Sequence, residues 1–154
     1  SIMSTSGERG KGEASLKVSL KMVQPVSKDK TPLDIAVDIW QMLCGPAYPM
    51  TDGEIRAQVI AEHKRSSNPA GYMRQISAIR TSPSRVALLN AIKVPTLIIH
   101  GNQDVLVPVS GGIDTAKHIA HAELVRFEGM GHTLPRELLE TFADLIVNNS
   151  AVQT

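Results

Sequence analysis

Two polar residues, Asp104 and His132, stand at corresponding places in a repeated pattern of the sequence. Each follows a short apolar run and a turn that contains glycine: residues 94–101 precede Asp104, and residues 122–127 precede His132. A carboxylate bonded to one imidazole nitrogen fixes the tautomer of the ring and favours the imidazolium, so the other nitrogen can act as a base toward a nucleophile. The spacing therefore predicts an acid–histidine pair, provided that the two runs end side by side.

The elements around this pair are predicted to be strand, helix, strand and helix. Residues 94–101 form a continuous apolar run rich in β-branched residues, which is typical of a strand buried on both faces. We expect a helix over about residues 112–120, a second strand over 122–127 and a closing helix over 136–147. This alternation predicts a parallel α/β sheet, whose ligands bind beyond the carboxyl ends of its strands. Because neighbouring strands lie about 4.8 Å apart, loops from their same ends can bring a carboxylate and an imidazole into contact.

The preceding region, over about residues 28–93, is predicted to be a series of short helices without a strand. Thr31 and Thr51 begin capping patterns that open the first two helices, and Asn68 and Ser82, each followed by proline, open two more. The apolar faces expected to be buried are Ile55, Val59 and Ile60 in the second helix and Leu138, Leu139, Phe142, Leu145 and Ile146 in the closing helix.

Composition and charge exclude several classes of protein. The chain has 154 residues, a formal net charge of +1 and 3% aromatic residues, so it lacks the basic field and the stacking surface typical of nucleic-acid binding. No apolar run reaches the roughly 18 to 20 residues of a membrane-spanning helix. The single cysteine, Cys44, cannot form an internal disulfide and suits a reducing compartment. We therefore expect a cytoplasmic protein without nucleic-acid or membrane partners.

The first twelve residues are predicted to leave a strand and enter a loop. Residues 1–4 are typical of a strand end, and neither an initiator methionine nor a charged leader precedes them. Residues 5–12 are polar and rich in glycine, which favours a loop. Lys11 is followed by Gly12 rather than by the serine or threonine of a phosphate loop, so phosphate binding is not favoured. We expect that the chain begins inside an element of a larger fold.

A purely structural role is the alternative for each polar candidate. Asp104 alone could cap its own turn, and His132 alone could be a satisfied histidine beside a glycine turn. Glycines at positions 101, 129 and 131 let the backbone turn tightly at both loops, which favours the acid–histidine pair. His100 adjoins the first turn and could touch the pair, although a packed histidine at a strand end is the stronger expectation.

The remaining titratable residues suggest no metal or cofactor site. His63, His118 and His121 are expected on or at the ends of helices, with no carboxylate or cysteine at metal-ligand spacing, so zinc is not predicted. No cofactor is predicted either. The acids interpreted most simply as solvated charges are Asp114, Glu123 and Glu128.

Two segments in this order resemble the α/β-hydrolase superfamily, in an esterase-like member. Residues 94–108, VPTLIIHGNQDVLVP, resemble the segment that places the catalytic acid after the seventh strand, and residues 129–132, GMGH, resemble the segment that places the catalytic histidine after the eighth. Residues 1–7 are similar to the end of the sixth strand, and residues 71–75, GYMRQ, match a stretch common in helical caps of the family. The resemblance covers essentially the whole chain.

The resemblance implies that Asp104 orients His132 and that His132 acts as general base and then general acid on an ester-like small molecule. The nucleophile of the family lies in Gly-x-Ser-x-Gly after the fifth strand, and the chain contains no such motif. The nearest match includes Ser110 but lacks the first glycine, so Ser110 is expected to be a helix N-cap. The family's oxyanion donors are missing too, so the chain alone is expected to be inactive.

The implied fold is the C-terminal part of an α/β-hydrolase sheet, with three neighbouring parallel strands, flanking helices and a helical cap. Residues 1–10 would be the strand end and a loop, 11–93 the cap or lid, and 94–154 the C-terminal part of the core. The large side chains that the lid could offer to an apolar substrate are Trp40, Met42, Tyr48 and Tyr72. A plain core role is equally open for each of them.

Two hypotheses of different classes follow. The chain is part of an esterase-like hydrolase whose activity needs the N-terminal half, or it is a non-catalytic module in which a truncated hydrolase fold serves binding or assembly. In either case the sixth strand would present an open apolar edge, which favours association with the missing half or with a second copy. Because the nucleophile is not in the chain, haloalkane and epoxide chemistry also stay open.

Overall fold

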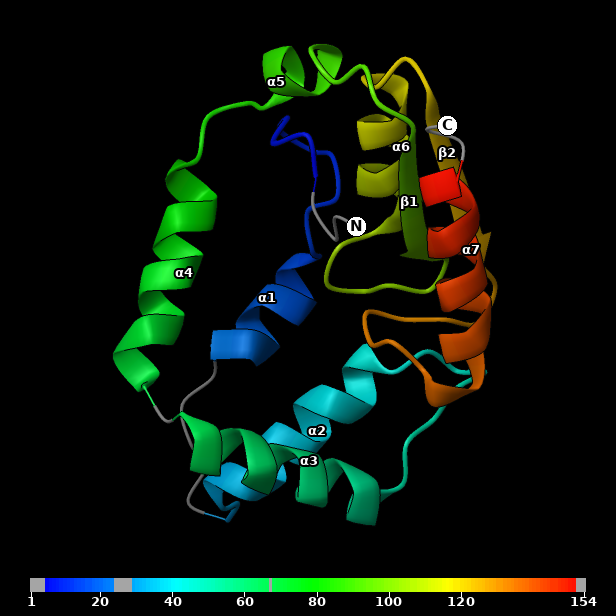
Figure 1. Cartoon of the computed structure of the whole chain (residues 1–154). Helices are drawn as coiled ribbons and strands as arrows, with labels where there is room; N and C mark the ends of the chain where they lie inside the picture. Colours follow the sequence, from blue (N-terminus) through cyan, green and yellow to red (C-terminus); the bar gives the residue numbers. More distant parts are fainter. Residues whose placement is uncertain (1–4, 24–28, 67, 152–154) are drawn as a thin grey trace.

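The computed structural model describes residues 5–23, 29–66 and 68–151, with only the backbone of Pro69 and Tyr72. Figure 1 shows two regions, a parallel sheet with helices beside it in the C-terminal part and a string of separate helices in the N-terminal part. The strand expected at residues 1–4 lies outside the described residues.

Within the described residues the sheet has two parallel strands, β1 (Thr96–Gly101) and β2 (Ala122–Phe127). They pair residue for residue over their whole length, so both strands end at the same edge of the sheet. Ile98 in the middle of β1 is only 2% exposed, as a β-branched residue in a covered strand should be. The predicted α/β fold class, with parallel strands joined by a helix, is confirmed.

Helix α6 (Val109–Lys117) makes the crossover between the strands and packs against both. It begins three residues before the predicted helix over 112–120, because Pro108 in an extended conformation occupies the N-cap position. Ser110 therefore lies inside the first turn, and its assignment as the N-cap was wrong. Its hydroxyl instead accepts a hydrogen bond of 3.3 Å from the backbone N–H of Gly12.

The closing helix is α7 (Leu139–Ala151), which a short 3-10 turn, η1 (Arg136–Leu138), precedes. Phe142 of α7 is buried, and its ring lies edge-on to that of Phe127 with the centroids 5.2 Å apart. The described sheet is only two strands wide and covers one stripe of α7. Part of the predicted apolar face is therefore about half exposed, contrary to expectation, at Leu139 and Ile146.

Helix α5 (Val86–Asn90) packs on the sheet and completes a small core. The buried members of this core are Leu89, Ile98 and Ile119, and partly buried Ile92, Ala116, Ala122 and Leu124 pack against them. The core thus joins α5, β1, β2 and the end of α6, and it fixes the sheet from which the polar loops emerge.

The helices before α5 are α1 (Leu16–Val23), α2 (Pro32–Leu43), α3 (Asp52–Arg65) and α4 (Pro69–Thr81). The capping boxes predicted at Thr31 and Thr51 are both present, each with its hydroxyl accepting the N–H of the acid three residues later. Asn68 caps α4 as predicted. Local capping chemistry therefore fixes where these helices begin.

Two helix starts differ from the prediction. Helix α1 was not expected, although Ser15 directly before it accepts the backbone N–H of Val18 at 3.3 Å, as an N-cap does. The cap-then-proline interpretation of Ser82 was wrong because the N–H of Ser82 donates to the carbonyl of Ala78 at 3.0 Å, which makes Ser82 the C-cap of α4. Helix α5 begins only at Val86.

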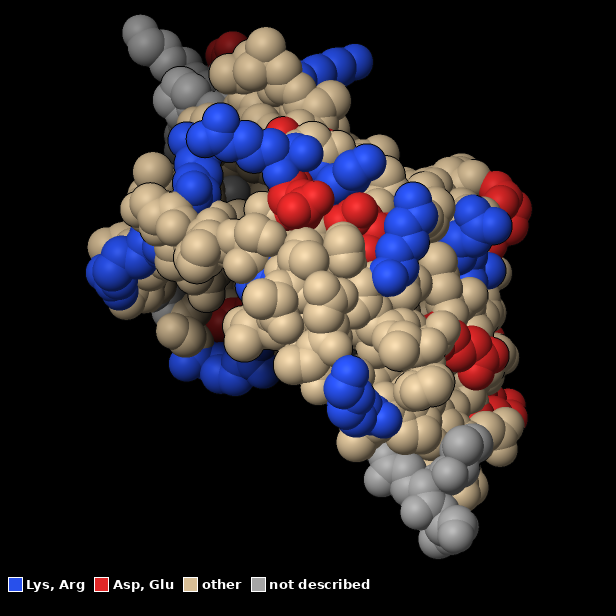
Figure 2. Space-filling model, turned by 90° about the horizontal axis from the view of Figure 1, so that it is seen from above, with Lys and Arg blue, Asp and Glu red and all other residues tan. Residues whose placement is uncertain are grey.

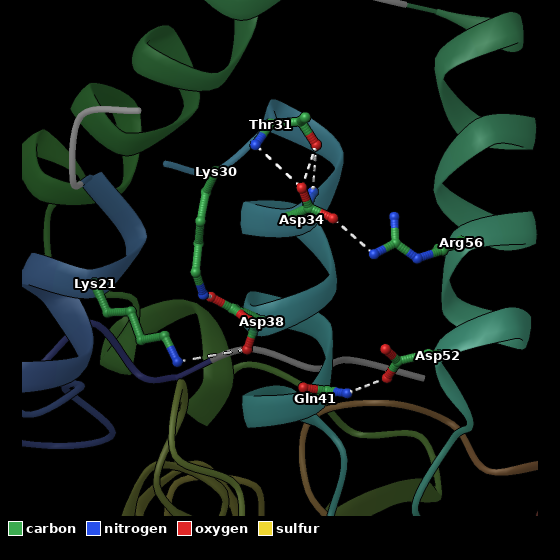
Figure 3. Close-up of polar contacts among 8 residues, drawn as sticks. All are labelled: Lys21, Lys30, Thr31, Asp34, Asp38, Gln41, Asp52 and Arg56. Carbon is green, nitrogen blue, oxygen red and sulfur yellow. Dashed lines mark hydrogen bonds and ion pairs between the residues drawn. The ribbon is translucent and has the colours of Figure 1, made fainter. Parts of the chain in front are cut away.

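Helices α2 and α3 pack together through few buried apolar residues and several exposed polar contacts. Val37 and Ile55 are buried, whereas Ile60, expected in the buried stripe, is 44% exposed because α3 meets α2 along a narrow face. Figure 3 shows Asp34 of α2 between the hydroxyl of Thr31 and the guanidinium of Arg56, which lies 2.6 Å from the carboxylate. The Thr31 hydroxyl first, and then Arg56, lower the pKa of Asp34 from 3.8 to about 2. Further pairs in the same view are Lys30 with Asp38 and Gln41 with Asp52.

No helix of the described residues combines the length and the hydropathy needed to cross a bilayer. On the face seen in Figure 2, Lys and Arg side chains alternate with acidic side chains and with broad uncharged areas. That face therefore presents mixed charge, in keeping with the formal net charge of +1.

Candidate functional site

Asp104 is held just beyond the end of β1 by a tight turn. Its backbone N–H donates to the carbonyl of Gly101 at 3.3 Å, and its residue is only 7% exposed. Its Oδ1 accepts the N–H groups of Leu106 at 2.9 Å and of Val107 at 2.8 Å. These two bonds fix the plane of a buried carboxylate and leave Oδ2 for another partner.

His132 follows β2 through a turn that only glycine fits. Gly129 has φ +73°, a left-handed conformation that side chains disfavour. A Cβ on Gly131 would lie 2.2 Å from the carbonyl oxygen of Leu43, and one on Gly101 would lie 2.3 Å from that of Met130. The backbones of both loops therefore approach each other closely, and this brings His132 over the end of β1.

The carboxylate and the imidazole meet as the sequence predicted. Oδ2 of Asp104 lies 2.8 Å from Nδ1 of His132. Since a carboxylate oxygen accepts, Nδ1 carries the proton and the neutral ring keeps its lone pair on Nε2. This arrangement can orient an imidazole and stabilise its protonated form.

His100 packs at the end of β1, as expected, and also lies beside the acid. It is 5% exposed, and its Nε2 donates to the carbonyl of Val107 at 2.8 Å. The same nitrogen is 3.9 Å from Oδ2 of Asp104, which is too long for a hydrogen bond. His100 therefore supports the loop that holds the acid and leaves the carboxylate oxygen to His132.

A pocket lies against the pair. Within the described residues no side-chain hydroxyl bonds Nε2 of His132, although this side chain is one quarter exposed. The pocket lining is mostly apolar and comes from β1, both loops and α7: Ile99, His100, Gly101, Asp104, Val107, Met130, Gly131, His132, Leu134, Phe142 and Ile146. The imidazole thus faces an apolar space, as ligand sites usually do.

A network that ties the two loops together was missed by the sequence analysis. Oε1 of Gln103 accepts the N–H of Gly129 at 2.6 Å, and the amides of Asn102 and Gln103 both donate to the carboxylate of Glu128. The Asn102 amide first, and then that of Gln103, lower the pKa of Glu128 below its usual range. Glu128 is therefore more than a solvated charge. The amides next to the acid in the sequence were the available signal.

The end of α2 docks on the histidine loop. The N–H of His132 donates to the carbonyl of Leu43 at 2.8 Å, and the N–H of Ala47 donates to that of Gly129 at 3.1 Å. A Cβ on Gly45 would lie 1.9 Å from the carbonyl oxygen of Gly129. This contact fixes the helical region against the site, and Gly45 gave no recognised signal in the sequence.

The predicted lid residues whose side chains are described do not reach this pocket. Trp40 and Met42 are half-buried in α2, and neither is in the pocket lining. Tyr48 is half-buried, and its N–H donates to the carbonyl of Gly45. The side chain of Tyr72 lies outside the described residues.

Asp114, expected to be a solvated charge, is buried instead. It is 7% exposed and accepts a hydrogen bond from the hydroxyl of Ser6, while Nε2 of His118 lies 3.8 Å from its Oδ2. Asp114, His118 and Glu8 form a group of possible metal ligands. The expectation that no carboxylate stands at metal-ligand spacing from His118 was wrong, because residues four apart share a helix face.

Comparisons with known proteins point to the same fold. The chain is 36% identical over 80 residues to a monoacylglycerol lipase of Bos taurus and 29% identical over 103 residues to a pimeloyl-[acyl-carrier protein] methyl ester esterase of Nitrosomonas europaea, over 50% and 60% of its length. A solved meta-cleavage product hydrolase from Pseudomonas fluorescens IP01 matches 99% of the chain with a TM-score of 0.63, at 20% identity. The chain has the α/β-hydrolase fold and is similar in sequence to members of that superfamily.

These similarities confirm the resemblance drawn from residues 94–108 and 129–132. No protein-family model matches the chain. The chain covers 24% of the length of the bovine lipase, 40% of the esterase and 52% of the solved hydrolase. The α/β-hydrolase fold seen here is thus shared with longer proteins.

Proposed function

We propose that the chain supplies the acid and the histidine of a Ser-His-Asp triad in a carboxylic-ester hydrolase. The observation that carries this proposal is the 2.8 Å contact between Oδ2 of Asp104 and Nδ1 of His132, beside an apolar pocket. The names of the two relatives, a lipase for monoacylglycerol and an esterase for a methyl ester, support an ester bond as the target.

In the proposed reaction Nε2 of His132 takes the proton of a serine hydroxyl as the serine oxygen bonds to the ester carbonyl carbon. The carbon–oxygen bond to the alcohol then breaks, and the proton on Nε2 goes to the leaving alkoxide. Asp104 holds the ring and stabilises its transient positive charge. A water molecule then takes the place of the serine hydroxyl and cleaves the acyl-serine by the same two proton transfers. The serine and the oxyanion donors would come from polypeptide outside these 154 residues.

The helical region would then be the lid. We propose that residues 1–10 are the strand end with its loop, that residues 11–93 are the lid and that residues 94–154 belong to the core. The docking of Leu43 and Gly45 on the histidine loop supports it. Large lid side chains would meet the substrate when further polypeptide completes the pocket, and the candidates are Trp40, Met42 and Tyr72. A cytoplasmic location and association through an open sheet edge stay predictions.

A second candidate is a non-catalytic module for binding or assembly. It is favoured by one observation, that no hydroxyl of the described residues meets Nε2 of His132. The two candidates differ in whether Asp104 and His132 affect turnover at all once the missing half is present.

The test compares the chain alone with the chain joined to the polypeptide encoded upstream in the same reading frame, using p-nitrophenyl butyrate. We expect no turnover by the chain alone. In the joined protein Asp104→Asn should lower kcat about 10⁴-fold, as for a triad aspartate, and His132→Ala at least as much. Asp144→Asn and His121→Ala, at exposed positions, serve as matched controls and should retain activity.

Three results would contradict the proposal in different ways. Turnover that survives His132→Ala would remove the triad assignment. Turnover by the chain alone that depends on His132 would place a nucleophile within these 154 residues. A folded joined protein that hydrolyses no ester would favour the non-catalytic module.

A further inference from the structure

The loop of residues 5–12 is fastened to α6, away from the pocket beside His132. The hydroxyl of Ser6, itself fully buried, donates to Oδ2 of Asp114, and the N–H of Gly12 donates to the hydroxyl of Ser110. Helix α6 runs from the end of β1 back to the start of β2, so its last residues lie at the opposite edge of the sheet from Asp104. In Figure 1 the loop runs alongside α6.

Three side chains of different kinds converge where this loop meets the helix. Glu8 comes from the loop, Asp114 from the middle of α6 and His118 from its C-cap. One ligand atom of each lies within 4.8 Å of the other two, and Nε2 of His118 is 3.8 Å from Oδ2 of Asp114. Ligands bound at about 2.0–2.2 Å to a tetrahedral ion lie roughly 3.3–3.6 Å apart, so small side-chain rotations suffice to close on a cation.

The surroundings of the group match those of a metal ligand set. Asp114 is buried and held by the Ser6 hydroxyl, as an oriented carboxylate ligand is usually held by a neighbouring donor. Glu8 is exposed, which leaves a path for the ion and room for water as the fourth ligand. One imidazole with two carboxylates suits Zn²⁺ better than Mg²⁺ or Ca²⁺, which prefer oxygen ligands alone.

We infer that Glu8, Asp114 and His118 form a binding site for a divalent transition-metal ion, with Zn²⁺ preferred. The ion joins a residue of the N-terminal loop to two residues of α6. It stabilises the folded chain because the three ligands are together only when the loop is docked. This site is separate from the acid–histidine pair and has a structural role.

The inference is tested with the purified, chelator-treated full chain and ZnCl₂ alone, by calorimetric titration and thermal unfolding. We expect one equivalent to bind and Tm to rise by about 5–10 °C at a zinc concentration about 100-fold above Kd. His118→Gln and Glu8→Gln should each weaken binding at least about 10-fold, and Ser6→Ala about 10-fold through loss of the bond that orients Asp114. MgCl₂ at the same concentration should have little effect.

Matched controls separate this group from other histidines and acids. His121→Gln and Glu123→Gln change the same residue types at exposed positions nearby and should bind zinc like the unaltered chain. His132→Gln should also bind normally. No binding at millimolar zinc would overturn the inference, as would equal affinity in the Glu8 and His118 variants. Loss of binding only in His132→Gln would move the ion to the other site.

Discussion

The C-terminal sheet and the N-terminal helices are held by different kinds of contact. In the sheet region Ile98 and Met130 are each 2% exposed, and glycine backbones approach within van der Waals distance at both loops. Among the described side chains of α2 to α4 only Val37 and Ile55 are buried, whereas Met73 and Ile79 are 58% and 76% exposed. The polar contacts there include capping boxes and exposed ion pairs. The acid and the histidine thus stand on the more densely packed region.

The largest effect in the helical region should come from Ile55, which is fully buried. Ile55→Ala removes most of a side chain that is 0% exposed, so we expect a loss of about 3 kcal/mol in the free energy of unfolding. Ile60→Ala on the same helix is the control and should cost about 1 kcal/mol or less, because Ile60 is 44% exposed. Urea denaturation measures both. Equal losses would mean that α3 packs differently.

A substitution where the end of α2 meets the histidine loop should lower the free energy of unfolding nearly as much. In Gly45→Ala the new Cβ would meet the carbonyl oxygen of Gly129, so the backbones must separate, at about 2–3 kcal/mol. Gly53→Ala is the matched control, because a Cβ there meets nothing within 4 Å and alanine favours a helix by about 0.5–1 kcal/mol. Destabilisation by the control, or none by Gly45→Ala, would contradict the docking of α2.

A cap should matter less than either packing contact. Thr31→Ala removes the hydroxyl that accepts the N–H of Asp34, and we expect a cost of about 1 kcal/mol, localised to α2. Hydrogen exchange should become faster in the first turn of α2 and should stay unchanged in β1 and β2. Thr31→Ser keeps the hydroxyl and should restore protection. Faster exchange in the sheet would show that the two regions unfold together.

The smallest effect is the acid dependence of this cap. The pKa of Asp34 is lowered from 3.8 to about 2, so its ionised form stabilises the folded chain. This contribution to the free energy of unfolding is fully present above pH 3.8 and is lost as the pH falls through about 2. Asp34→Asn cannot titrate, so its difference in Tm from the unaltered chain should shrink over that window. A difference that stays constant between pH 4 and 2 would contradict the assignment.

Several patterns of local origin in the sequence predicted the right structure, although the caps expected at Ser82 and Ser110 did not. The β-branched run of β1, the capping boxes at Thr31 and Thr51 and the glycine turn before His132 each depend on neighbouring residues alone. The meeting of Asp104 with His132 was predictable because parallel strands end at one edge.

Features that depend on distant partners were missed. Asp114 is buried because Ser6, 108 residues earlier, supplies a hydrogen bond, and Glu128 is held by amides about 25 residues away. The exposure of Ile60 depends on how much of α3 its neighbour covers. Sequence periodicity gives the apolar face of a helix but not the extent of the surface that covers it.

Asp104 is assigned to fix the tautomer of His132, and ¹⁵N NMR of the histidine-labelled chain can observe that tautomer. At alkaline pH, where the ring is neutral, we predict that the proton of His132 resides on Nδ1 and that Asp104→Asn shifts it toward Nε2. His121, which is exposed, serves as the internal reference and should not respond to the substitution. A proton mainly on Nε2 of His132 in the unaltered chain would show that Asp104 does not fix the tautomer.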